Sequence, residues 1–322
     1  MNIIHRPDWA LPESAVTPER AVLDRRALML AAGAGALAAS AGPAHAQRAD
    51  QAPDPSASLY PAPRNPAFRE VDRPITAENA ATTYNNFYEF GSHKQIWRAA
   101  QALRIRPWEI RIEGEVERPF TIAIDDLLRR VTLEERVYRL RCVEAWAMVV
   151  PWVGFPMADL LRIANPTSRA RYVRFDTFHD AQMAPGQRQF WYQWPYVEGL
   201  SIAEANHPLS MMVTGAYGKP LPRQMGAPIR MIVPWKYGFK SGKSINRIVF
   251  QAERPKTFWI ASGPDEYGFW ANVNPAVPHP RWSQSSERML GTDERRPTLP
   301  YNGYAAEVAG LYAGMTGERL YM

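Results

Sequence analysis

The chain has 322 residues, of which 46% are hydrophobic and 22% are charged, and its formal net charge at pH 7 is +6. This composition is typical of a folded globular protein and excludes a disordered chain, a collagen and a bundle of membrane helices. The single cysteine, Cys142, excludes intramolecular disulfides, zinc sites of paired cysteines and protein-held iron–sulfur clusters, because all of these need several thiols. The positive charge suits an anionic ligand or a membrane surface, and no motif points to a nucleic acid.

Residues 1–46 have the features of an export signal. Arg25 and Arg26 precede a mildly apolar stretch over residues 27–42, and an Ala-His-Ala cleavage motif follows at residues 44–46. The stretch is shorter than the about 20 residues that span a bilayer. The paired arginines favour a twin-arginine signal over a Sec signal or a membrane anchor. Because this route exports folded proteins, mainly those that bind a cofactor first, we expect a cofactor and a periplasmic location.

The remaining chain is expected to form one domain behind a short arm. Residues 47–73 are rich in proline and alanine and predict an extended N-terminal arm. Residues 74–322 contain no second linker and no internal repeat, which favours a single domain.

Alternating and helical patterns predict short elements along this domain. Alternation predicts strands over residues 108–112, 137–142 and 173–177, and short apolar runs predict strands over residues 229–233 and 244–250. Apolar spacing predicts short helices over residues 124–130 and 157–164. Many strands with few short helices predict an α+β fold with a mixed sheet.

Cys142 follows Tyr138 and Leu140 on one face of its predicted strand, and Arg139 and Arg141 project from the other face. It can be an inert buried residue, a nucleophile with a histidine base, or a ligand of a soft or high-valent metal. No protease signature surrounds it. An unpaired thiol in an oxidising compartment is a liability unless it is masked or used, and Arg141 beside it would favour the thiolate. These points favour metal ligation.

Two further segments suggest ligand binding. The basic loop over residues 236–243, together with Ser244, contains the pattern Gly238-x-x-x-Gly242-Lys243-Ser244. This pattern is one residue shorter than a P-loop, and a strand pattern follows it instead of a helix. This pattern disfavours a nucleotide triphosphatase. Backbone N–H groups and lysines could still hold a phosphate-like anion, and a solvated basic turn is an equally good interpretation. Residues 82–90 combine aromatic and amide side chains, which fit either a strand edge or hydrogen bonds to a heterocycle.

Five segments together resemble the catalytic subunits of the periplasmic protein-methionine-sulfoxide reductase family, which are molybdoenzymes. They are residues 84–90 (YNNFYEF), 141–146 (RCVEAW), 150–156 (VPWVGFP), 233–240 (VPWKYGFK) and 279–284 (HPRWSQ). The resemblance extends from about residue 74 to the C-terminus. It implies a sulfite-oxidase-like fold that carries one Mo-molybdopterin without an attached nucleotide.

The resemblance also implies site residues. Cys142 matches the family's molybdenum-ligating, catalytic cysteine. The residues that match its pterin-binding positions are Asn85, Tyr88, Glu89, Thr177, Arg230, Ser241, Gly242 and Lys243. Met225 stands where the family commonly has asparagine, so only its backbone could contact the pterin, and Ser241 replaces a more usual glycine. Glu144, if it continued the strand, would share the face of Cys142 and serve in proton delivery or in a structural hydrogen bond.

The implied activity is reduction of methionine sulfoxide residues in oxidised periplasmic proteins, with electrons from a membrane-embedded haem b subunit that is fed by quinol. The twin-arginine export machinery would be a further partner. Aromatic residues such as Trp235 and Tyr237 could line an open approach for a protein substrate. Two alternatives stay open: the same cofactor could oxidise sulfite, or the chain could be a cofactor-free periplasmic binding protein in which Cys142 belongs to the core.

Overall fold

The computed structural model describes residues 54–68 and 71–321. The expected signal over residues 1–46 and the first part of the arm, residues 47–53, lie outside the described residues. The described part of the arm contacts the domain: the Tyr60 hydroxyl donates to the carbonyl of Thr214 at 2.8 Å, and the Asn65 amide donates to the carbonyl of Glu135 at 2.8 Å. Within the described residues, no helix has the length and hydropathy needed to span a membrane.

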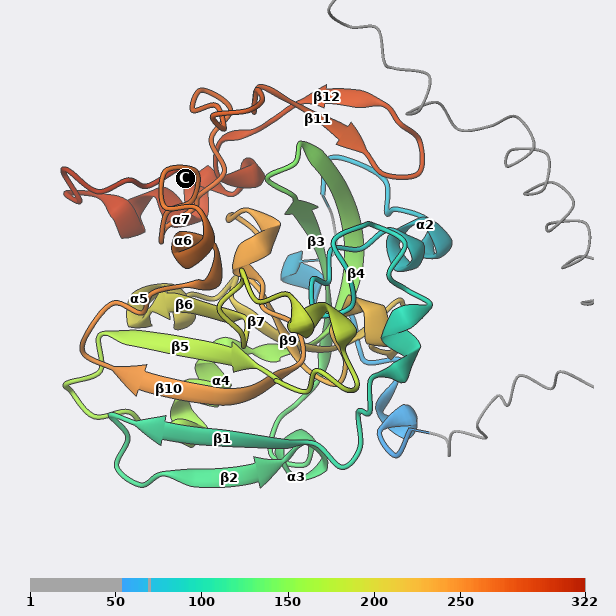
Figure 1. Ribbon diagram of the computed structural model, residues 1–322, viewed down its shortest axis with the longest axis vertical. Coiled ribbons are helices and arrows are strands. Elements are labelled where there is room, and N and C mark those ends of the chain that lie inside the picture. The colour runs from blue at the N-terminus through green and yellow to red at the C-terminus, as the bar shows by residue number, and fades with distance from the viewer. Residues whose placement is uncertain (1–53, 69–70, 322) are drawn as a thin grey trace, which may run out of the picture. The chain divides into compact units, whose positions relative to one another are not determined.

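The first of two mixed sheets has five strands in the order β2–β1–β10–β5–β6 (Figure 1). Its strands are β1 (Glu109–Gly114), β2 (Phe120–Ala123), β5 (Tyr172–Thr177), β6 (Val197–Ser201) and β10 (Ile245–Gln251). β1 pairs in parallel with β10, and the other pairs are antiparallel. Gly114 ends β1 with φ 88°, a left-handed conformation that favours glycine.

The second sheet has seven strands and is organised around β4. Its strands are β3 (Glu134–Arg141), β4 (Trp146–Pro156), β7 (Met211–Ala216), β8 (Lys219–Pro220), β9 (Arg230–Ile232), β11 (Ser286–Met289) and β12 (Arg295–Pro297). β4 pairs antiparallel with β3 and β7, and in parallel with β11. Every residue of β4 except Pro156 is buried, as expected for a strand that is covered on both faces.

The helices are short. They are α2 (Glu78–Thr83), α3 (Ile124–Leu128), α4 (Met157–Ala164), α5 (Ile202–Ala205), α6 (Phe258–Ser262) and α7 (Ala305–Val308). Short 3-10 helices cover Ala57–Leu59, Pro66–Phe68, Ala99–Ala102, Pro185–Arg188, Arg223–Met225, Gly238–Lys240, Pro300–Gly303 and Ala309–Tyr312. In α4 the residues Met157, Leu160, Leu161 and Ala164 are buried, so the predicted helical spacing packs one face into the core.

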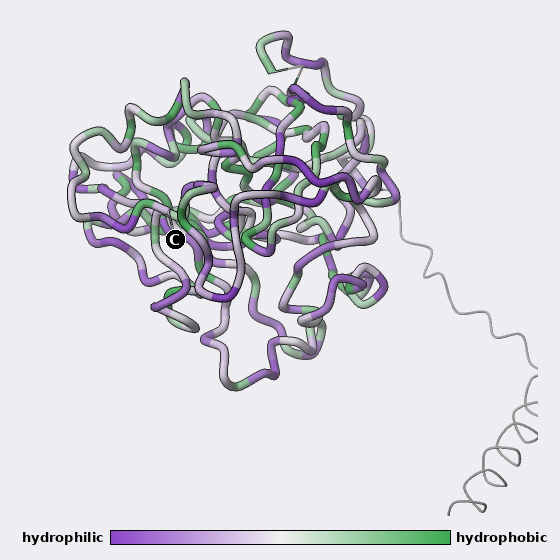
Figure 2. The backbone as a smooth tube through the Cα atoms, turned by 90° about the horizontal axis from the view of Figure 1, so that it is seen from above, coloured by the Kyte–Doolittle hydropathy of each residue, from purple (hydrophilic) through white to green (hydrophobic). Residues whose placement is uncertain are grey.

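The predicted strands and helices are confirmed, with ends that coincide or differ by up to three residues. The α+β class with mixed sheets is confirmed as well. The apolar side chains of the two sheets and of the short helices share one large core cluster. Figure 2 shows hydrophobic stretches through the interior and hydrophilic stretches in many peripheral loops. The loops between the strands of both sheets lie outside this regular structure, and they carry the residues of the candidate site.

Candidate functional site

A cavity of about 840 Å³, part of which is open to solvent, gathers the predicted site residues from distant parts of the chain. Eight of them line it: Asn85, Tyr88, Glu89, Cys142, Arg230, Ser241, Gly242 and Lys243. The ninth, Thr177, does not line the cavity but donates its hydroxyl to the Glu89 carboxylate at 2.9 Å. The loop before β1, the β3–β4 turn and the basic loop thus meet at one place.

The β3–β4 turn presents Cys142 to the cavity. The Cys142 amide donates to the carbonyl of Trp146 at 2.9 Å, and the Ala145 amide donates to the carbonyl of Cys142 at 3.1 Å. Ala145 has φ 61°, so the turn uses a left-handed residue that is not glycine. Glu144 lies in this turn and does not continue the strand, yet its Oε2 is 3.6 Å from the Cys142 Sγ. The turn, and not strand alternation, brings the two side chains together.

Arg141 and residues from the C-terminal part of the chain donate hydrogen bonds to the carbonyls of this turn. The guanidinium of Arg141 donates to the carbonyl of Cys142 and, at 2.8 Å, to the Gln284 side-chain oxygen. The Gln284 amide and the Trp282 indole N–H both donate to the carbonyl of Val143, at 2.8 and 2.7 Å. The segment over residues 279–284 therefore fixes the cysteine turn, a role that the sequence motif alone did not reveal.

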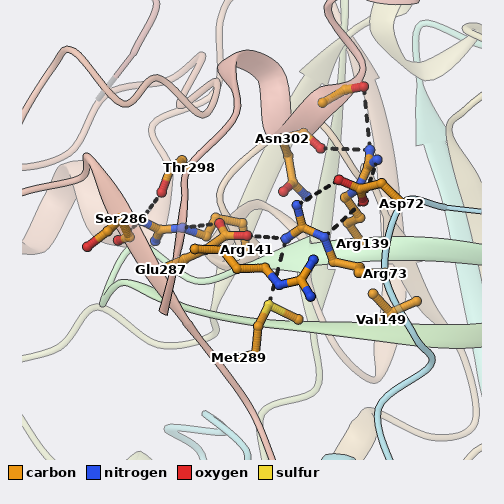
Figure 3. A network of polar contacts seen from close by, with 12 residues as sticks. Asp72, Arg73, Arg139, Arg141, Val149, Ser286, Glu287, Met289, Thr298 and Asn302 are labelled. Carbon is orange, nitrogen blue, oxygen red and sulfur yellow. Dashed lines mark hydrogen bonds and ion pairs between the residues drawn. The ribbon is translucent and has the colours of Figure 1, made fainter. Parts of the chain in front are cut away.

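Arg141 itself points away from the thiol. Its Nε donates to Glu287 at 2.9 Å, on the face of β3 opposite to Tyr138 and Leu140. Glu287 also pairs with Arg73, and Figure 3 shows how Asp72 and Arg139 extend this chain of alternating charges. The expectation that Arg139 and Arg141 project from the face of β3 opposite to Tyr138 and Leu140 is confirmed. Arg141 is fully buried on that face in an ion pair and does not face the sulfur.

The surroundings of Cys142 disfavour a free thiolate. Burial and, to a smaller extent, the charge of Glu144 raise the pKa of the Cys142 thiol to about 12. The Asn86 amide nitrogen lies 3.4 Å from the sulfur, and the described residues that line the cavity include no histidine. A nucleophilic cysteine needs a base or a lowered pKa, so this geometry does not support cysteine hydrolase chemistry. A bound cation would deprotonate the thiol, because a metal makes a coordinating thiol a thiolate.

Two cations that line the cavity form no ion pair with any of the described residues. The guanidinium of Arg230 is buried and donates to three carbonyls, of Met225 at 2.9 Å, Ser241 at 3.1 Å and Met231 at 3.4 Å. Burial lowers its pKa to about 9. The Lys243 ammonium makes no hydrogen bond or ion pair with any residue that the structure describes. Burial, and then the charge of Arg230, lower the Lys243 pKa to about 7. Unpaired cations in such a place indicate an anionic ligand.

The other lysines of the basic loop are used differently. Lys236 pairs with Glu204 at 2.5 Å, and Lys240 pairs with Glu198 at 2.6 Å, with all four side chains buried. The interpretation of this loop as a solvated basic turn is therefore wrong. Two of its lysines anchor the loop to β6 and α5, which leaves Lys243 as the lysine of the loop that reaches the cavity.

Asn85 and Glu89 add polar groups to the cavity wall. The Asn85 amide nitrogen donates to the carbonyl of Ala81 at 2.9 Å, whereas its Oδ1 is buried and has no hydrogen-bond partner among the described residues. Burial raises the pKa of Glu89 to about 7, despite the hydrogen bond from Thr177. A buried acceptor without a donor is the kind of group that a heterocyclic ligand satisfies.

Met225 lies behind the cavity. It is buried, does not line the cavity, and its carbonyl accepts the hydrogen bond from Arg230. Gly226, which follows, has φ 102°, and a Cβ there would lie 2.7 Å from the Cβ of Lys243. The glycine therefore lets the 3-10 turn over Arg223–Met225 pack directly against Lys243.

Trp235 and Tyr237 do not line the cavity, contrary to the expectation from the sequence. Both are buried, and the Trp235 indole N–H donates to the Tyr312 hydroxyl at 2.7 Å. The aromatic residues that do line the cavity are Phe87, Tyr88, Trp146, Tyr196, Phe239, Trp259 and Tyr267. Trp259 lies in α6, which the sequence patterns did not predict, and no signal marked its contact with the site.

The fold and this arrangement of one buried thiol, two cations and an amide oxygen without a hydrogen-bond partner fit the class of molybdopterin-binding oxidoreductases. The family model of the oxidoreductase molybdopterin binding domain matches residues 98–259. The protein-methionine-sulfoxide reductase catalytic subunit MsrP of Xanthomonas axonopodis pv. citri (strain 306) is 49% identical over 312 residues, which cover 95% of this chain and 96% of that protein. The chain belongs to the family of protein-methionine-sulfoxide reductase catalytic subunits, and its cofactor is Mo-molybdopterin.

A second relative covers a similar share of the chain. The protein of the same name from Ralstonia nicotianae (strain ATCC BAA-1114 / GMI1000) is 48% identical over 315 residues, which cover 95% of this chain and 94% of that protein. Among solved structures, the sulfane dehydrogenase SoxCD from Paracoccus pantotrophus matches with a TM-score of 0.44 and 16% identity, over 67% of this chain and 56% of that chain. The family resemblance predicted from five sequence segments is confirmed.

Proposed function

We propose that this chain reduces methionine sulfoxide residues of periplasmic proteins to methionine and so repairs oxidised envelope proteins. The observation that carries the proposal is the cavity in which Cys142 lies together with the unpaired cations Arg230 and Lys243. It occurs in a chain that is 49% identical to a catalytic subunit named for this reaction.

The residues present fit the cofactor in charge and in hydrogen-bonding capacity. Cys142 would ligate the molybdenum, and Arg230 and Lys243 would balance the charge of the pterin phosphate. The free Oδ1 of Asn85 would accept a hydrogen bond from a pterin N–H. Tyr88, Glu89 with Thr177 behind it, and the backbone of Ser241 and Gly242 would complete the binding wall. When bound, the cofactor supplies two-electron chemistry that, with two protons, converts a sulfoxide into a thioether and water.

Glu144 would orient the turn that carries the metal ligand. Its Oε2 accepts hydrogen bonds from the Asn86 amide at 3.1 Å and from the Trp146 indole at 3.3 Å, and it pairs with Lys94 at 2.5 Å. Burial acts to raise the Glu144 pKa, but the hydrogen bond and charge of Lys94 lower it below its ordinary value. The carboxylate is therefore an ionised acceptor that ties three neighbouring segments to the cysteine turn.

The partners follow from the family and from the N-terminal sequence. We propose that a membrane-embedded haem b subunit, fed by quinol, supplies the electrons, and that oxidised periplasmic proteins are the substrates. Arg25 and Arg26 support export of the folded chain by the twin-arginine route. The net charge of +6 would help docking at an anionic membrane surface.

A holoenzyme from cells that make molybdopterin tests the proposal. With a reduced viologen dye as electron donor, we expect dye oxidation that depends on methionine sulfoxide in a protein, and about one molybdenum per chain by elemental analysis. Sulfite oxidation in place of sulfoxide reduction would establish the alternative reaction. A fully folded, metal-free chain from the same cells would instead indicate a cofactor-free binding protein.

A further inference from the structure

Two aromatic side chains are left in solvent beside the site. Phe190 is 90% exposed and Trp191 is 60% exposed, which makes them the most exposed of the large hydrophobic residues that the structure describes. Their rings contact each other edge to face, with centroids 5.2 Å apart. A soluble domain gains by burying such rings, so an exposed pair indicates a surface that contacts something else.

The loop that carries this pair is anchored. The Trp194 indole N–H donates to the carbonyl of Gln189 at 3.1 Å, which closes the loop over residues 189–194. Tyr192 and Trp194 both pack on Phe258, each with ring centroids 5.1 Å apart. The inner rings of the loop are therefore held against α6, while Phe190 and Trp191 point away from the core.

A continuous series of rings joins the exposed pair to the cavity. The centroids of Trp191 and Tyr192 are 6.2 Å apart, and Tyr192 lies 5.9 Å from Tyr88 and 6.2 Å from Trp259. Tyr88 and Trp259 contact each other at 5.0 Å, and both line the cavity. The exposed pair is thus connected through Tyr192 to the aromatic residues of the cavity wall, but neither ring lines the cavity.

We propose that Phe190 and Trp191 form a docking surface for the polypeptide on one side of an oxidised methionine in a protein substrate. This inference rests on the proposed function. When the sulfoxide side chain of a substrate enters the cavity, the substrate residues on either side of it stay at the rim. An extended chain of at most about five residues, at about 3.3 Å each, is long enough to reach from Tyr88 to Phe190. Flat aromatic rings contact apolar side chains of many sequences, which suits a substrate defined by its oxidised methionine and not by a sequence motif.

The chemistry of the loop favours a polypeptide over a lipid surface. Residues 189–194 (QFWYQW) contain no charged side chain, and the exposed Arg188 before them donates its Nε–H to the carbonyl of Ala181 at 3.0 Å. Surfaces that bind anionic membranes combine apolar residues with lysine and arginine. The glutamines on both sides of the rings can instead hydrogen-bond to the backbone of an extended peptide.

The test compares two substrates of the holoenzyme with a reduced viologen dye as donor. One is a synthetic peptide with a central methionine sulfoxide and leucines within about five residues on either side. The other is free methionine sulfoxide. In the double variant Phe190→Ala/Trp191→Ala we expect KM for the peptide to rise about tenfold, as for loss of a hot-spot pair. We expect KM and kcat for free methionine sulfoxide to stay unchanged.

The matched control is the double variant Leu59→Ala/Ile75→Ala. These side chains are 42% and 41% exposed and do not line the cavity, so both substrates should keep their wild-type KM. An unchanged peptide KM in Phe190→Ala/Trp191→Ala overturns the inference, and so does an equal rise for both substrates, which would mean that the loop only supports the cavity. Loss of vesicle binding or of a dimer with an unchanged peptide KM would assign the surface to a membrane or to a second copy. A wild-type enzyme that reduces neither substrate would contradict the proposed function itself.

Discussion

Replacing Lys243 with methionine removes a charge from the cavity while keeping a long unbranched side chain. The ammonium has no anionic partner in the described part of the chain, and burial, followed by the charge of Arg230, lowers its pKa from 10.5 to about 7. Each pKa unit corresponds to about 1.4 kcal/mol, so even half of this lowering means that the charged lysine destabilises the cofactor-free chain by about 2 kcal/mol at pH 7. In a domain of this size, we therefore expect the Tm of cofactor-free Lys243→Met to lie about 5 °C above that of the wild type.

The pH dependence of this gain has a definite sign. A lysine whose pKa is lowered in the folded state carries no penalty above its unfolded pKa of 10.5, an increasing penalty as the pH falls, and the full penalty below about 7. The gain from Lys243→Met should therefore be largest near pH 7 and shrink toward pH 10. Arg230, Glu89, Cys142 and Lys94 also act on the ammonium, so the quantity to follow is the difference in Tm between variant and wild type at each pH.

The same substitution should have the opposite effect on the loaded enzyme. A charge-assisted hydrogen bond to a phosphate contributes about 1.5–3 kcal/mol, so we expect molybdenum retention of Lys243→Met to weaken about tenfold or more, measured as metal and pterin content after dialysis. Lys240→Met is the matched control, because it leaves Glu198 buried without its partner and should lower the Tm. A cofactor-free Lys243→Met that is less stable than the wild type, together with full molybdenum content, would refute the reasoning.

Three further substitutions test the site. Cys142→Ser should fold normally but lose at least about a hundredfold in sulfoxide turnover, because a serine hydroxyl stays protonated where a thiolate is needed; wild-type turnover would contradict the assignment of the ligand. Gln284→Ala removes a donor to the carbonyl of Val143 and should lower the Tm by about 1–4 °C. It should also change kcat more than KM, by lowering kcat. An unchanged kcat would limit Gln284 to a structural role. Thr177→Val removes a hydrogen bond to Glu89 and should lower the free energy of unfolding, measured by urea titration, by about 1 kcal/mol at pH 8 and by less at pH 5. The reason is that Glu89, with a pKa of about 7, is ionised only at the higher pH. An equal loss at both pH values would contradict the assigned pairing.

Much of the fold could be predicted because the relevant signals are local. The buried face of α4 repeats with a helical period, and the alternation in β1 and β5 reports which face is covered, so both are visible in short windows of sequence. The turn after β3 was harder to predict. The alternation over residues 137–142 predicted an end at Cys142, one residue beyond the observed end at Arg141, but it did not show that a turn with Ala145 at φ 61° follows and brings Glu144 beside Cys142.

The candidate site was predicted in part. The motif strings pointed to Asn85, Tyr88, Glu89, Cys142 and the end of the basic loop, and the structure brings all of them to one cavity. Thr177 lies one hydrogen bond behind the wall. The grip of residues 282–284 on the cysteine turn was not visible, since it depends on contacts across about 140 residues of chain, and the separation in sequence carries no signal of it.

By itself, the sequence determined which chemistry was possible: one cysteine excludes every site that needs several thiols, and the local strings around it identify the family. Only the tertiary structure decided which of the basic residues are available to bind an anionic ligand. Lys236, Lys240 and Lys243 are equivalent in a basic loop, but α5 and β6 supply buried carboxylates to the first two and none to the third. Charge becomes available to a ligand only where folding leaves it without a partner, and that depends on residues distant in the chain.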